Sequence, residues 1–146
     1  MPRYSASCVT TNGGTTARPL MSLFAAASVG GSVVEIGIAN TTSTSCQFRI
    51  ARCTAAGTPG TGLGEEKYDT TSAAASCTAA NSHSADATVS ADTVGGIAQL
   101  GAAVGAGWIW TFGAGGLRIP TGTANGIGII PIGTGQVITA YFVWDE

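Results

Sequence analysis

The amino-acid sequence predicts an all-β protein, a single jelly-roll-like β-sandwich of about eight short antiparallel strands. The first reason is that β-branched and aromatic residues gather in short clusters. The second is that segments rich in Gly, Thr, Ser and Asn separate these clusters, and the chain contains 22 glycines. The third is the alternation of apolar and polar residues within several clusters. Because no repeat and no second compositional zone is visible, residues 1–146 are expected to form one domain.

The first part of the chain leaves two questions open. Residues 1–19 are rich in Thr and Gly, and the alternation of Tyr4, Ala6 and Cys8 with serines predicts a short first strand. The same segment could instead serve as an extended N-terminal arm. Residues 20–27 form a short apolar run, for which periodicity alone does not decide between helix and strand.

The middle of the chain contains two clear strand signals and one low-complexity segment. Residues 33–38 are rich in β-branched side chains, and residues 46–52 alternate in the manner of a half-buried strand. Residues 70–95 are mostly Ser, Ala and Thr, so we expect a long loop there, or an arm lying on a neighbouring molecule. Residues 97–104 have spacing compatible with a short helix.

The C-terminal region carries the strongest strand pattern. Its signals are alternating aromatic residues after position 107, an Asn125–Gly126 pair typical of a hairpin, and Pro131, which favours an edge strand or a bulge. Residues 136–144 place apolar side chains on both faces, so both faces are expected to be covered. The candidate core or interface residues are Trp108, Trp110, Phe112, Tyr141 and Trp144.

The charge content excludes some classes of function. Only 10% of residues are charged and the net charge is −2, so the chain lacks the basic surface of a nucleic-acid-binding protein. No run of 18 apolar residues predicts a membrane span, and no signal peptide is recognised at the N-terminus. Because a surface with so few charges is poorly protected against association, we expect other subunits to cover much of it.

No catalytic or metal-binding motif stands out, and we expect neither an enzyme nor a cofactor. A nucleophilic site would have to use His83, the one histidine, but its context lacks a nucleophile motif and favours a solvent-exposed loop. The carboxylates at 65, 66 and 69 lie beside a lysine in a polar stretch, which favours a solvated loop. The cysteines form no CxxC pair and are expected to be buried, with Cys46–Cys53 and Cys53–Cys77 bridges left open; they are Cys8, Cys46, Cys53 and Cys77.

Glu35 stands among apolar residues of a strand, so it lies either on an exposed face or in an ion pair. Arg49 and Arg52 on the following strand are its natural partners. The tryptophans could alternatively form a platform for stacking against sugars, although strand periodicity favours core or interface positions.

Six segments share a recognisable pattern of turns and strands: Glu35–Thr42, Gly57–Gly60, Leu100–Trp108, Trp110–Gly113, Gly122–Gly128 and Val143–Glu146. Together they resemble a group of small tailed-bacteriophage virion proteins. The resemblance covers most of the chain, is weakest over residues 70–95, and consists of turns and strands rather than catalytic residues. It implies a capsid decoration protein that assembles in the bacterial host cytoplasm and binds the major capsid protein on the capsid exterior as a homotrimer. A carbohydrate-binding module on the virion and a tail or neck component are the alternatives.

Overall fold

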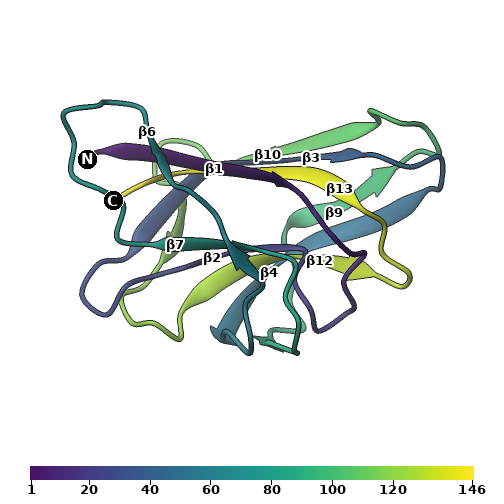
Figure 1. The fold of residues 1–146 in the computed structure, drawn as a ribbon, viewed down its shortest axis with the longest axis horizontal. Coiled ribbons are helices and arrows are strands. Elements are labelled where there is room, and N and C mark those ends of the chain that lie inside the picture. Colours follow the sequence, from purple (N-terminus) through teal and green to yellow (C-terminus); the bar gives the residue numbers. More distant parts are fainter.

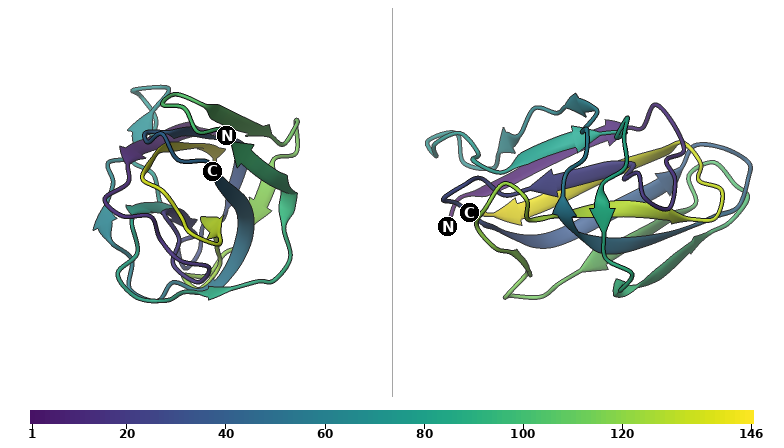
Figure 2. Two further views of the ribbon diagram at one scale, coloured as in Figure 1. Left: turned by 90° about the vertical axis from the view of Figure 1, so that its right-hand side faces the viewer. Right: turned by 90° about the horizontal axis from the view of Figure 1, so that it is seen from below.

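A computed structural model describes residues 1–146 and confirms the all-β prediction. Two antiparallel sheets, of six and seven strands, pack face to face as a sandwich (Figure 1). Viewed end-on, the two layers curve around a common interior (Figure 2). No helix long and apolar enough to cross a membrane is found.

The strands are β1 (Arg3–Val9), β2 (Met21–Phe24), β3 (Gly31–Asn40), β4 (Cys46–Ala55), β5 (Thr61–Gly62), β6 (Glu66–Lys67), β7 (Thr78–Asn81), β8 (Thr88–Val89), β9 (Val94–Leu100), β10 (Gly107–Thr111), β11 (Leu117–Ile119), β12 (Gly126–Ile132) and β13 (Ile138–Asp145).

Eight of these strands form the jelly roll. One sheet contains the order β10-β3-β13-β1, and the other contains β2-β12-β4 with β9 paired to β4. Among these eight, the first strand pairs with the last, the second with the seventh, the third with the sixth and the fourth with the fifth. This nested pairing is that of a long hairpin rolled into a sandwich, the jelly-roll arrangement. The short strands β5, β6, β7, β8 and β11 extend the edges of the two sheets.

The core lies between the two sheets and follows the predicted alternation. In β13 every second side chain faces inward and is buried, from Ile138 to Trp144. The opposite face of β13 is only partly covered, because Thr139 is exposed and Tyr141 is half-buried. The expectation that both faces of this segment are covered therefore does not hold in the single chain.

Three local expectations differ from the structure. Residues 97–104 form no helix: their first part belongs to β9, because pairing with β4 overrides the weak helical spacing. Asn125–Gly126 does not close a hairpin, since the strands on either side of it, β11 and β12, lie in different sheets. Pro131 lies in a central strand, but pairing with β2 ends at Ile129, so the proline requires no hydrogen bond on that side.

Parts of the two segments that were candidate arms pair with strands of the sandwich. Within residues 1–19, β1 pairs along its whole length with β13. Residues 20–27, left open between helix and strand, contain β2. Within residues 70–95, β7 pairs with β2 and β8 pairs with β4.

Both chain ends lie at one end of the sandwich (Figure 1). The N–H of Glu146 donates to the C=O of Pro2 at 3.0 Å, and Arg3 forms an ion pair with Asp145 at 2.7 Å. The ends of β1 and β13 are thus held together as neighbouring strands.

Candidate functional site

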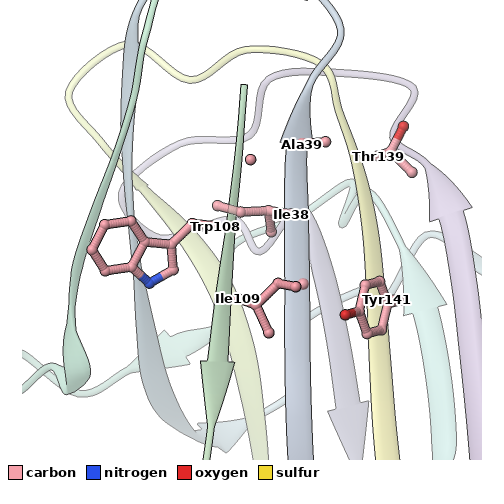
Figure 3. A pocket seen from close by; sticks show the side chains of 8 residues that line it. Ile38, Ala39, Trp108, Ile109, Thr139 and Tyr141 are labelled. Atoms are coloured by element: carbon pink, nitrogen blue, oxygen red, sulfur yellow. The ribbon is translucent and has the colours of Figure 1, made fainter. Parts of the chain in front are cut away.

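The outer face of the β10-β3-β13 sheet carries an open groove, which we call the β10 groove. At its floor Gly37 of β3 lies opposite Ile109 of β10 on one side and Tyr141 of β13 on the other. Because Gly37 has no side chain, the two larger residues border a hollow of about 530 Å³ (Figure 3). Two glycines line the groove together with Ile38, Ala39, Trp108, Ile109, Thr139 and Tyr141, and none of these residues is charged.

Glu35 holds the side chain of Tyr141 by a hydrogen bond. Glu35 lies on the same face of β3 as Gly37, two residues before it. The Tyr141 hydroxyl donates to Oε1 of Glu35 at 2.6 Å. Burial, together with this bond, raises the pKa of Tyr141 to about 12, so the hydroxyl stays protonated at neutral pH. The single acidic side chain at this part of the face therefore has a bonded partner within the same sheet.

The predicted ion pair between Glu35 and an arginine is not formed. Glu35 belongs to β3, whereas Arg49 and Arg52 belong to β4 in the other sheet. Arg49 donates instead to the carbonyl groups of residues 90, 91 and 92, and Arg52 donates to the C=O of Arg118. Consecutive strands of a jelly roll lie in different sheets here, so adjacency in sequence misled the pairing.

The aromatic candidates divide between core and surface. Trp144 is fully buried and stacks on Tyr4 with ring centroids 5.9 Å apart. Trp110 is 4% exposed, whereas Trp108 is 41% exposed with its ring 6.3 Å from that of Trp110. Phe112 is partly buried and packs against the core. Trp110 and Trp144 therefore cannot stack on a ligand, and only Trp108 presents a tryptophan ring to solvent.

Exposed aliphatic residues near Trp108 were not identified from the sequence as site residues. Ile109 is 59% exposed, and Ile97 and Val104 of the neighbouring strand and loop are also exposed. A signal was present for Ile109, because it falls between Trp108 and Trp110 and so must face the opposite side of the strand. Which side faces solvent depended on the packing of the two sheets.

His83 is not a solvent-exposed loop residue, and this expectation was wrong. It is 1% exposed, and its Nε2 lies 2.7 Å from Oγ of Ser22, itself fully buried in β2. Burial lowers the pKa of His83, so the imidazole is neutral at neutral pH. The pair ties the segment after β7 to β2, and the buried Ser22 hydroxyl is out of reach of a substrate in this conformation.

The remaining reactive groups are held in structural contacts. All four cysteines are free, so neither candidate disulfide is present, and burial raises the pKa of Cys8 and Cys53 to about 11 and that of Cys77 to about 12. No group of three or more His, Cys, Asp or Glu side chains is placed to hold a metal ion. Glu65 accepts a hydrogen bond from the N–H of Ala79 at 2.9 Å.

The structure thus brings Ile109 and Tyr141 together at the β10 groove, with Glu35 bonded to Tyr141 and the Trp108 ring on the opposite side of β10 from Ile109. The groove and the adjacent edge of β10 form an open, uncharged surface, and they constitute the candidate site. Comparison of the chain with protein-family models, with curated proteins and with solved structures gives no match in any of the three.

Proposed function

We propose that this chain is a structural protein of a tailed-phage virion that decorates or cements the capsid. In this proposal it binds the major capsid protein lattice on the capsid exterior as a homo-oligomer, with a trimer at three-fold positions. It binds neither nucleic acid nor membranes and catalyses no reaction. The observation that carries the proposal is the uncharged β10 groove beside the exposed side chains of Trp108 and Ile109.

The low charge supports association as the main activity. An apolar surface that is open in one chain gains free energy when another molecule covers it, at about 25 cal/mol per Å² of apolar area removed from water. An obligate protein–protein interface buries about 2,000 Å² or more. The resemblance of the strand and turn segments to small phage virion proteins supports the capsid as the second partner.

The proposal is tested on virions assembled with and without the gene for this chain. Electron microscopy of the purified particles should show additional density of 14.4 kDa per copy on the capsid exterior only when the gene is present. Density at the tail or neck, in a few copies per particle, would support the alternative structural role instead. Absence of the chain from purified particles that were assembled with the gene present would overturn the proposal.

A carbohydrate-binding module is the second candidate, because Trp108 presents a partly exposed ring at the β10 edge, on the opposite side of the strand from Ile109. Aromatic faces of this kind stack on sugar rings. A glycan-binding assay should then show binding that is lost in Trp108→Ala. The matched control is Ile97→Ala, which removes an exposed apolar side chain outside the groove. If both variants and the parent bind no glycan, this second candidate is rejected.

A further inference from the structure

β10 is a free edge strand whose outward backbone groups are not hydrogen-bonded within the chain. It pairs only with β3, and no strand lies on its other side in the sheet. The C=O of Ala106 and the N–H of Phe112 are bonded to β3 at 2.8 Å and 3.0 Å. Because alternate residues of a strand direct their N–H and C=O groups to opposite sides, those of Gly107, Ile109 and Thr111 point away from β3. All three residues are exposed.

The other long sheet edges are protected. β9 contains Gly95 and Gly96, both at positive φ, and its register with β4 is shifted at that point. β1 is paired with β6 over part of its length, and the C=O of Val9 accepts a hydrogen bond from Asn81 at 3.2 Å. β7 is covered by β5. Bulges and covering strands of this kind prevent pairing with another chain.

β10 has none of these protections. It contains no charged residue, no proline and no register shift. Its flanking side chains are apolar and open to solvent, with Trp108 41% exposed and Ile109 59% exposed. An uncharged, apolar edge without a bulge is a template for the addition of a further strand.

We propose that β10 pairs antiparallel with β10 of a second copy of this chain, about a two-fold axis at Ile109. The three outward residues are symmetric about this position, so Ile109 faces its own equivalent and Gly107 faces Thr111 of the second copy. Every outward N–H and C=O of β10 then finds a partner. The sheet that contains β10 in one copy continues across the axis into the same sheet of the second copy. Such self-complementary contacts are characteristic of two-fold oligomers.

Among the sheet edges that a second copy could offer, its own β10 fits this edge best. No charges meet when the strand pairs with itself, so like-charge repulsion does not oppose the contact. A head-to-tail contact with the open part of β1 is less favourable, because the C=O of Val9 is already bonded and β6 covers Tyr4 and Ser5. The contact goes beyond the proposed function, and it holds whether or not the chain belongs to a capsid.

The two-fold contact has a defined consequence for the assembly. Alone it produces a dimer, and together with a three-fold contact whose axis crosses the two-fold axis at a right angle it produces an assembly of six. A trimer without further association contains no two-fold axis. The oligomeric state of the isolated chain therefore tests this inference independently of binding to virions.

The experiment is light scattering coupled to gel filtration, on the parent chain and on three variants. The parent should show twice the chain mass of 14.4 kDa, or six times that mass. Ile109→Lys places a charge on the edge, and Ile109→Pro removes an outward N–H that the single chain does not use. Both should raise the dissociation constant of the two-fold contact by at least about tenfold, which corresponds to 1.4 kcal/mol. Ile97→Lys makes the same change in charge at an exposed residue of β9 and should leave the mass unchanged.

Circular dichroism of each variant establishes that it is folded, and hydrogen exchange provides a second measurement on the unmodified chain. The amides of Gly107, Ile109 and Thr111 should become more protected as protein concentration rises. A parent that is monomeric at about 100 μM, well above the dissociation constants of stable complexes, would overturn the inference. A trimer in which these three amides exchange freely would also overturn it, as would equal dissociation by Ile109→Lys and Ile97→Lys.

Discussion

Replacing Gly37 by alanine tests whether the ring of Tyr141 can keep its position only because residue 37, opposite it, has no side chain. The three atoms nearest to a Cβ at position 37 all belong to Tyr141, with Oη 2.7 Å away and two ring carbons closer still. The ring must therefore move, and its 2.6 Å hydrogen bond to Glu35 is broken or lengthened. The groove between Ile109 and Tyr141 changes shape at the same time.

The expected cost follows from three contributions. Overpacking costs about 1–3 kcal/mol, toward the lower end here because the ring can turn toward solvent. Loss of a solvent-accessible hydrogen bond adds about 0.5–1.5 kcal/mol. Alanine is favoured over glycine in a strand by about 0.5–1 kcal/mol, which offsets part of the loss. We expect Gly37→Ala to lower the free energy of unfolding by about 1–2 kcal/mol.

Urea unfolding followed by tryptophan fluorescence measures this change, and Tyr141→Ala provides the matched background. Without the ring, the added methyl group no longer meets Tyr141, so Gly37→Ala should stabilise that background by about 0.5–1 kcal/mol. The double-mutant cycle should then give a coupling energy of about 1.5–3 kcal/mol. An equal cost of Gly37→Ala in both backgrounds would refute the argument that the ring causes it.

Three further predictions concern groups away from the groove. Burial lowers the pKa of His83 in the folded chain, so the unfolded chain binds a proton at His83 more readily than the folded chain does. The free energy of unfolding should therefore be constant above about pH 6.5 and should fall as the pH drops from there toward the folded-state pKa. The loss should not exceed about 1.4 kcal/mol per pH unit, and urea unfolding at several pH values should show a smaller slope for His83→Gln; equal slopes would contradict the assignment. Glu146→Gln should speed hydrogen exchange at the amides of Ser76 and Cys77, which donate to the Glu146 carboxylate at 2.8 Å and 2.9 Å, and unchanged exchange would show that the carboxylate does not hold that segment. The thiols of Cys53 and Cys77, with pKa values of about 11 and about 12, should react with an aromatic disulfide at neutral pH only after urea unfolds the chain, and rapid labelling of the native protein would disprove their burial.

The strand pattern and the fold class could be predicted because they depend on local alternation. The apolar side of β13, from Ile138 to Trp144, is visible as a period of two, and the structure buries those side chains. The same reasoning predicted the half-buried strand that became β4. Short strands such as β5 and β6 were not predicted, since two-residue pairings leave no periodic signal.

The candidate site could be predicted only in part. Trp108 was identified as an interface candidate, and its alternation with Ile109 showed that the two residues face opposite sides of one strand. The pairing of Gly37 with Tyr141 joins residues far apart in the chain, and nothing local to either residue indicates the other. For the same reason the sequence indicated either an exposed position for Glu35 or an ion pair with Arg49 or Arg52, whereas Tyr141 on the last strand bonds to it.

The sequence by itself determined that the chain forms short strands, that they enclose an apolar interior, and that few charges protect its exterior, because these properties follow from composition and from a two-residue period. Tertiary structure alone decided which strands are neighbours, and with them the burial of His83 against Ser22 and the free edge at β10. Side-chain alternation reports that one face of a strand is covered. It does not report what covers that face, because the jelly roll pairs the beginning of the chain with its end.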